Sequence, residues 1–185
     1  VADFSNFMGA VINERAYTRL SGYLERAKND ASCTVHAADR WSKEVGWFCG
    51  PTLVEVSDPK HALMQEELFG PVLSVYVYAD DALEETLTLL DETSPYALTG
   101  SVFARERKVI DRVAQRLRNA AGNFYVNDKP TGAVVGQQPF GGGRGSGTND
   151  KAGCSYNLLR WASPRTVKET FVSPTSVGYP FMREP

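Results

Sequence analysis

Apolar side chains recur with helical spacing early in the chain and alternate with polar ones further on. Between residues 13 and 29 they fall on a single helical face, at Ala16, Leu20, Tyr23, Leu24 and Ala27. Asn13 is a favourable N-cap residue, so this pattern predicts an amphipathic helix that begins there. Alternating runs at 34–37 and 47–56 predict strands, with boundaries at Gly46, Gly50 and Pro51.

The later part of the chain alternates strands with helices. An apolar strand is expected at 72–78, helices at 80–92 and 108–121, and strands at 98–104 and 123–127. This alternation, with short connections, predicts an α/β fold with a mostly parallel, helix-covered sheet. Ligand sites of such sheets lie beyond the carboxyl ends of the strands, and the strand at 123–127 ends in a long glycine-rich segment.

Composition and charge narrow the class of protein. The chain has 185 residues, of which 42% are hydrophobic and 23% charged, and this suits one soluble domain with a sizeable core. The net charge of −2 offers no basic surface, so nucleic acid is not an expected partner. No window approaches the roughly 20 apolar residues of a membrane-spanning helix, so a membrane is not an expected partner either.

Three cysteines and two histidines are the residues on which metal or thiol chemistry would depend. Cys33, Cys49 and Cys154 form no C-x-x-C pair and have no histidine at ligand spacing. This pattern favours a reducing compartment and predicts no metal site. His36 and His61 are interpreted as structural residues, because the sequence assigns them no nucleophile or carboxylate partner.

The stretch 123–153 is the main candidate for chemistry. It has seven glycines from Gly132 to Gly147, a composition that lets the backbone approach a ligand closely, but it lacks both G-x-x-x-x-G-K-[ST] and G-x-G-x-x-G at a strand-to-helix turn. The main-chain N–H groups around Gly132 and Ala133 are candidates for a concavity that binds a carboxylate, and an exposed turn is the alternative. Phe140 is either a wall for an aliphatic chain or a packing residue.

Two adjacent acidic residues mark a second candidate site. Glu66 and Glu67 stand shortly before Phe69 and the Gly70-Pro71 pair. Adjacent acids are most often solvated surface residues. In the alternative interpretation, a carboxylate two positions before an aromatic residue accepts hydrogen bonds from ribose hydroxyls while the ring packs against the ligand.

Two motifs resemble known proteins. EELFGPV at 66–72 resembles the E-E-[IL]-F-G-P-V motif of the aldehyde dehydrogenase superfamily, and the block at 118–153 resembles the carboxyl-terminal signature of its 1-pyrroline-5-carboxylate dehydrogenase family. The resemblance implies that Glu67 binds the nicotinamide ribose of NAD and that Phe69 lies beside the nicotinamide. It also implies that the amides of Gly132 and Ala133 bind the substrate carboxylate and that Phe140 lines the methylene chain.

The resemblance implies an activity for the whole protein. This activity is the NAD-dependent oxidation of L-glutamate γ-semialdehyde to L-glutamate, in the mitochondrial matrix or, in a bacterium, in the cytoplasm. The family's nucleophilic cysteine and general base would lie upstream of Val1, so no catalytic residue is expected in this chain and the chain alone is expected to be inactive. Another semialdehyde dehydrogenase and a non-catalytic assembly module are the alternatives.

The resemblance also divides the chain. Residues 1–163 are expected to form the carboxyl-terminal part of an incomplete catalytic domain, and residues 164–185 an oligomerisation strand and tail. Within this second part, Thr166, Lys168 and Thr170 alternate with Val167, Glu169 and Phe171. The strand at 165–171 is expected to pair with a neighbouring subunit, so the whole protein is expected to be a homo-oligomer, a dimer or higher.

Overall fold

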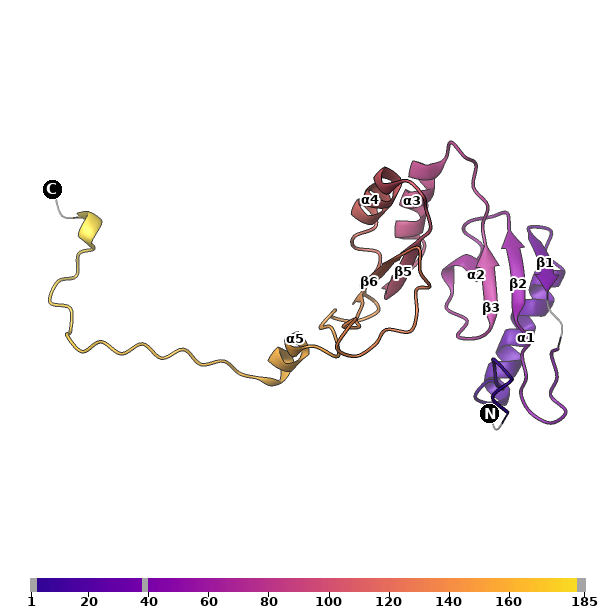
Figure 1. Ribbon diagram of the computed structural model, residues 1–185, viewed down its shortest axis with the longest axis horizontal. Helices are drawn as coiled ribbons and strands as arrows, with labels where there is room; N and C mark the ends of the chain where they lie inside the picture. The colour runs from indigo at the N-terminus through magenta and orange to yellow at the C-terminus, as the bar shows by residue number, and fades with distance from the viewer. Residues whose placement is uncertain (1–2, 38–39, 183–185) are drawn as a thin grey trace.

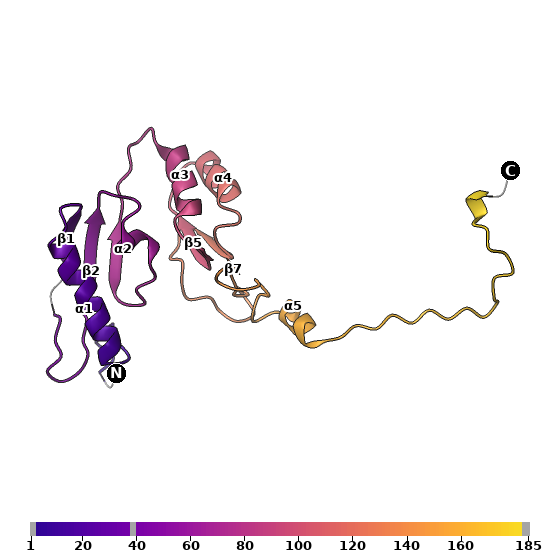
Figure 2. The same ribbon diagram turned by 180° about the vertical axis from the view of Figure 1, so that it is seen from behind.

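The computed structural model describes residues 3–37 and 40–182, which form two folded units and an extended tail (Figure 1). Figure 2 shows from behind that the two units lie side by side and that the carboxyl terminus lies far from both. The first unit ends with strand β3 (Val72–Val75), and the second begins with helix α3 (Leu83–Glu92). None of the helices within the described ranges has the length and apolar character needed to cross a bilayer.

The first unit packs helix α1 and the short helix α2 (Ala62–Gln65) with a three-stranded sheet. Helix α1 (Glu14–Lys28) begins where Asn13 Oδ1 accepts a hydrogen bond of 2.9 Å from the Ala16 N–H, which confirms the predicted N-cap. Strand β2 (Thr52–Val56) lies between β1 (Cys33–Ala37), which is antiparallel to it, and β3, which is parallel. The core consists of Leu20, Ala27, Cys49, Val54, Val56, Leu63 and Leu68.

The second unit contains the parallel, helix-covered pair that the alternating pattern predicts. Strands β5 (Thr99–Val102) and β6 (Asn123–Val126) run parallel and are connected by helix α4 (Arg107–Arg116). Helices α3 and α4 pack on this pair through a core of Leu87, Val113 and Leu117. A second pair, which is antiparallel, joins β4 (Tyr96–Ala97) to β7 (Gly143–Arg144) in the glycine-rich segment.

The α/β class and the order of elements are confirmed, but the sheet is divided more finely than expected. The described residues form three small sheets, in which β1–β2 and β4–β7 are antiparallel. The strand predicted at 47–56 begins only at Thr52, because the main chain of Phe48 pairs with Ser42 instead. The helix predicted at 108–121 ends at Arg116, and the residues after it turn the chain toward β6.

The tail carries little regular structure. After helix α5 (Ser155–Leu158) and the 3-10 helix η1 (Leu159–Trp161), no helix or strand occurs until η2 (Pro180–Met182). The predicted strand at 165–171 has no strand partner among the described residues, and its Val167 and Phe171 side chains are exposed. A strand needs a neighbour to pair its main-chain groups, so the assembly role of this segment stays a prediction.

Candidate functional site

The segment between α2 and β3 is held by the core and presents two side chains outward. Leu68 is buried, whereas Glu67 and Phe69 on either side of it are exposed. Gly70 lies so close to α1 that a Cβ atom there would stand 2.5 Å from Leu20 Cδ1. The buried Leu68 and the absence of a side chain at Gly70 therefore keep this segment against the core.

The two adjacent acids of this segment differ in their partners. Tyr23 of α1 donates a hydrogen bond to Glu66, and this bond raises the pKa of Tyr23. Glu67 accepts no hydrogen bond from the described residues, so its carboxylate is open to a ligand. The Phe69 ring is 85% exposed on a left-handed backbone with φ of 50°, and both Glu67 and Phe69 line the same surface hollow. A carboxylate without a partner can accept hydrogen bonds from ribose hydroxyls, and an exposed aromatic ring can pack against a nicotinamide ring.

The glycine-rich segment leaves the carboxyl end of β6 as a long loop. Gly132 has a left-handed backbone with φ of 79°, which glycine adopts without strain, and Ala133 is half-buried. The N–H groups of Gly132 and Ala133 donate to no other group of the described residues. Directly after them, Val134 O accepts the N–H groups of Gln137 and Gln138, which closes a turn. Two successive amides without a partner beside a closed turn are able to bind a carboxylate.

Phe140 is held by its main chain further along the same loop. Its N–H donates to Ala152 O at 2.9 Å, and the Ala152 N–H donates to Phe140 O at 2.8 Å. The Phe140 side chain is 37% exposed, so part of the ring is available to a ligand. The loop thus presents two amides without a partner among the described residues and a partly exposed aromatic ring.

The five residues predicted from the sequence fall into two sets on different units. Glu67 and Phe69 belong to the first unit, and Gly132, Ala133 and Phe140 belong to the second (Figure 1). No hydrogen bond or ion pair between the two sets occurs within the described part of the chain. The structure therefore assembles each set locally but does not join them.

Gly122 and Gly142 allow main-chain segments of the second unit to pack directly against one another. A Cβ atom at Gly122 would stand 1.9 Å from Gly141 O, and one at Gly142 would stand 2.6 Å from Ala97 O. Neither position has room for a side chain. The sequence suggested that the glycines from 132 to 147 serve the close approach of a ligand, whereas at Gly142 the packing of the protein itself is the reason. Gly122, outside that range, serves the same packing.

A charged network ties the loop to helix α3. Arg144 of β7 donates to Asp91 Oδ1 at 2.5 Å and to Asp91 O at 2.7 Å, and Arg116 of α4 donates to Asp91 Oδ2 at 3.1 Å. The hydrogen bond from Arg144 lowers the pKa of Asp91, and the bond from Arg116 lowers it further. No sequence pattern singled out this network, because its members are distant along the chain and share no motif.

Asp91→Asn is expected to lower the free energy of unfolding of the full-length protein by about 1 kcal/mol near neutral pH. Because the folded-state pKa of Asp91 lies below its ordinary value, the carboxylate stabilises the fold above that value and ceases to do so as the pH falls through the folded pKa. The free energies of unfolding of wild type and variant, measured in urea, should therefore differ at about pH 7, and the difference should become smaller at about pH 3. Asp111→Asn, which removes an exposed pair with Arg107, is the control, and a pH-independent gap would contradict the assignment.

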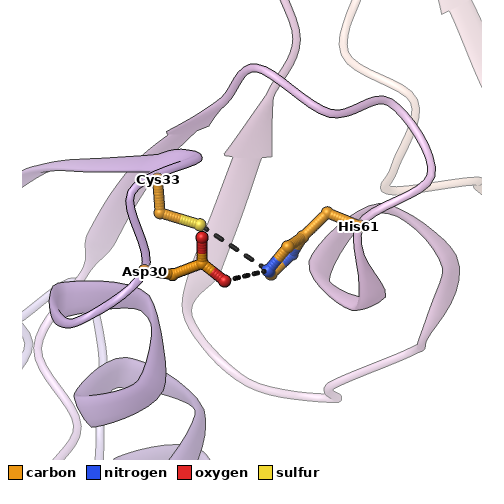
Figure 3. Close-up of side chains that lie close together, drawn as sticks. All are labelled: Asp30, Cys33 and His61. Atoms are coloured by element: carbon orange, nitrogen blue, oxygen red, sulfur yellow. Dashed lines mark hydrogen bonds and ion pairs between the residues drawn. The ribbon is translucent and has the colours of Figure 1, made fainter.

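Asp30, Cys33 and His61 come together in the first unit, although the sequence indicated no histidine partner for the cysteines (Figure 3). His61 Nε2 lies 3.3 Å from Asp30 Oδ2 and 3.7 Å from Cys33 Sγ. A hydrogen bond from the Ser32 hydroxyl lowers the pKa of Asp30, and burial raises the pKa of the Cys33 thiol. The cluster connects the end of α1 with β1 and the start of α2.

The hydrogen bonds of His61 favour a structural role over a metal-binding one. Its Nδ1 accepts the Leu63 N–H at 3.1 Å and caps α2, which assigns the proton of the neutral ring to Nε2. A metal ion on Nε2 would move that proton to Nδ1, where it would oppose the Leu63 N–H. Metal binding would thus break the cap, and a thiol with a raised pKa is a poor source of thiolate. That the chain holds no metal site stays a prediction.

The sequence of the chain is similar to those of known proteins. The chain matches the aldehyde dehydrogenase family over residues 2–167. It is 55% identical over 183 residues to the mitochondrial delta-1-pyrroline-5-carboxylate dehydrogenase of Dictyostelium discoideum, and 49% identical over 181 residues to the human protein of that name. These matches cover 99% and 98% of this chain but 33% and 32% of the relatives, so the chain spans about a third of their length.

Solved structures give the same relationship. The crystal structure of the Delta-pyrroline-5-carboxylate dehydrogenase from Mycobacterium tuberculosis is similar with a TM-score of 0.79 at 50% identity, and the match covers 100% of this chain and 33% of that one. The structure of the same protein bound with NAD has a TM-score of 0.79 at 51% identity, over 98% of this chain and 33% of that one. Because the family match extends over most of its residues, the chain belongs to the aldehyde dehydrogenase family.

Proposed function

We propose that this chain is the carboxyl-terminal portion of an NAD-dependent dehydrogenase that oxidises L-glutamate γ-semialdehyde to L-glutamate in proline catabolism. The observation that carries the proposal is the loop after β6, where the free amides of Gly132 and Ala133 share one loop with the Phe140 ring. The names of the relatives support the same reaction. Because the relatives from Dictyostelium discoideum and human are named as mitochondrial, we propose the matrix as its location, with the cytoplasm as the location in a bacterium.

The chemistry of the substrate fits the order of groups in the loop. Glutamate γ-semialdehyde has an α-carboxylate at one end, a short methylene chain and an aldehyde at the other end. The N–H groups of Gly132 and Ala133 would bind the carboxylate without a cationic side chain, and Phe140 would lie along the methylene chain. Fixing the carboxylate end orients the aldehyde toward the residues that react with it.

The first unit is proposed to bind the cofactor. The Glu67 carboxylate, which has no partner among the described residues, would accept hydrogen bonds from the ribose hydroxyls, and the exposed Phe69 ring would lie beside the nicotinamide. Bound NAD supplies the acceptor for the hydride that leaves the substrate. Glu66 is the weaker candidate because Tyr23 already occupies its carboxylate.

Glu67→Gln in the full-length enzyme is expected to raise the KM for NAD about tenfold, because hydrogen bonds to a charged acceptor are worth about 1.5–3 kcal/mol. The KM for the semialdehyde should change less than about twofold, since the substrate set lies on the other unit. Steady-state kinetics with each substrate varied in turn measure both constants. Glu66→Gln is the matched control, and an equal response to the two substitutions would contradict the assignment of Glu67.

The nucleophile and the general base are proposed to lie outside these 185 residues. The family's reaction needs a thiolate to attack the aldehyde, whereas burial raises the pKa of the Cys33 and Cys49 thiols. Neither thiol is therefore activated for attack. The chain by itself is expected to be inactive, and the full-length protein is expected to be the enzyme.

A direct assay separates the proposed function from its alternatives. The full-length protein should oxidise glutamate γ-semialdehyde with a higher kcat/KM than succinic semialdehyde. Equal values would favour a different semialdehyde dehydrogenase, which would typically recognise its carboxylate with a cationic side chain. No turnover of either aldehyde would favour a non-catalytic assembly module.

The tail is proposed to pair with a neighbouring subunit. Residues 165–171 have no strand partner in the described part of this chain, and their apolar side chains Val167 and Phe171 are 74% and 89% exposed. Strand addition to another copy would pair the main chain and cover these side chains. Light scattering should show that the full-length protein is a homo-oligomer and that deletion of 164–185 reduces its mass to that of a monomer. An unchanged mass would contradict the proposal.

A further inference from the structure

Lys151 occupies an unusual position in the second unit. Its ammonium group lies 2.5 Å from Gly122 O, 3.3 Å from Gly141 O and 3.5 Å from Asn123 Oδ1. The side chain is half-buried and has no carboxylate partner among the described residues. A lysine that leaves solvent for uncharged oxygens gives up hydration, so these oxygens must be held where the ammonium can reach all of them.

The groups that Lys151 reaches surround Phe140. Asn123 Nδ2 donates to Pro139 O at 3.2 Å, and the Gly141 N–H donates to Asn123 Oδ1 at 3.2 Å. The residues before and after Phe140 are therefore both bonded to one side chain at the start of β6. Lys151 donates to the Asn123 side chain and to Gly141 O. Ala152, the residue after Lys151, pairs with the main chain of Phe140.

These hydrogen bonds form a closed network around Phe140, which we call the brace and which consists of Asn123, Gly141, Lys151 and Ala152. Asn123 belongs to β6, which is fixed in the parallel sheet, whereas Phe140 belongs to a loop with few other bonds to that sheet. Lys151 is the only charged member, and hydrogen bonds to a charged donor are about twice as strong as those between neutral groups. Without its ammonium, Gly122 O and Gly141 O would lose a donor, and the loop would be free to shift relative to β6.

We propose that Lys151 is a positioning residue that fixes the Phe140 ring at the substrate pocket by bridging Gly141 of the loop to Gly122 and Asn123 at the start of β6. The inference rests on the proposed function, because Phe140 matters only where it lines the substrate. Lys151 itself does not touch the substrate. Its effect is on how well the pocket fits the methylene chain, and hence on the affinity for the semialdehyde and not for NAD.

The experiment uses the full-length enzyme with Lys151→Met, which keeps an unbranched side chain and removes the charge. We expect the KM for glutamate γ-semialdehyde to rise about tenfold, while the KM for NAD stays within about twofold of wild type. Lys151→Arg keeps a charged donor but a bulkier one, so its KM for the semialdehyde should lie between those of wild type and Lys151→Met. Lys108→Met on the exposed face of α4 is the matched control.

Hydrogen exchange locates the change independently of turnover. In Lys151→Met, the amides of Phe140, Gly141 and Ala152 should exchange faster than in wild type, whereas those of β5 should not. If exchange speeds up throughout the second unit and both KM values rise together, Lys151 is a general stabilising residue and the proposal is wrong. An unchanged KM for the semialdehyde would also overturn it. If wild type itself shows no preference for glutamate γ-semialdehyde, the proposed function fails, and exchange at Phe140 still decides whether the brace exists.

Discussion

Replacement of Gly132 by valine in the full-length enzyme is expected to raise the KM for glutamate γ-semialdehyde about a hundredfold and to leave the KM for NAD nearly unchanged. Gly132 has a φ of 79°, in the left-handed region that a β-branched residue strongly disfavours. Valine would pull the backbone out of this conformation and turn the amides of Gly132 and Ala133 away from the proposed position of the substrate carboxylate. A hundredfold change corresponds to about 2.8 kcal/mol, which is the loss expected when these hydrogen bonds to a charged group, each worth about 1.5–3 kcal/mol, are weakened or one of them is lost.

The same loop offers a control for the effect of backbone strain. Gly136 has nearly the same conformation, with φ of 83°, and a Cβ atom there would have no neighbour within 4 Å. Gly136→Val therefore introduces comparable strain away from the proposed carboxylate site. We expect Gly136→Val to lower stability as Gly132→Val does but to leave the KM for the semialdehyde within about threefold of wild type. Equal KM values for the two variants would show that the amides of Gly132 and Ala133 do not bind the substrate.

Gly122→Ala is expected to have the largest effect on stability, a loss of about 3 kcal/mol or more in the free energy of unfolding. The added Cβ atom would stand 1.9 Å from Gly141 O and 2.7 Å from Gly142 Cα. These are backbone atoms, so no rotation of a side chain relieves the overlap. The loop that carries Phe140 would have to separate from the start of β6. Urea unfolding followed by circular dichroism measures the loss.

The same replacement of glycine by alanine at Gly22 in the first unit should raise the free energy of unfolding instead of lowering it. Gly22 lies inside α1, and a Cβ atom there would meet only Arg26 Nη1 at 3.5 Å, an ordinary contact. Gly22→Ala should stabilise the helix by about 0.5–1 kcal/mol, because alanine loses less backbone entropy than glycine on folding. If both substitutions destabilise to the same extent, the close contact at Gly122 is not the cause of its effect.

Sequence patterns predicted the features that depend on neighbours along the chain. The helix capped by Asn13 and the β5–α4–β6 unit follow from spacing and from local capping. The difference between Glu66 and Glu67 depends on Tyr23, which is 43 positions away, so no local pattern contains it. The choice of Glu67 came instead from resemblance to a family.

Contacts across long stretches of chain account for what the sequence did not predict. His61 meets Asp30 because α2 packs beside the end of α1, although the two residues are 31 positions apart in the sequence. The antiparallel pair β4–β7 forms because the glycine-rich segment returns to the second unit, although its composition resembles that of an open loop. Strand pairing of this kind is fixed by tertiary packing and not by local preference.

The lack of hydrogen bonds and ion pairs between the two described units bears on how substitutions combine. Destabilising changes at distant sites without shared partners usually add, with a coupling energy of a few tenths of a kcal/mol. Damage to the core beneath Leu68 and damage at Gly122 should therefore sum in the double variant, because no bond transmits one to the other. The residues proposed to bind the cofactor and those proposed to bind the substrate are thus expected to tolerate substitutions independently, with little epistasis between them.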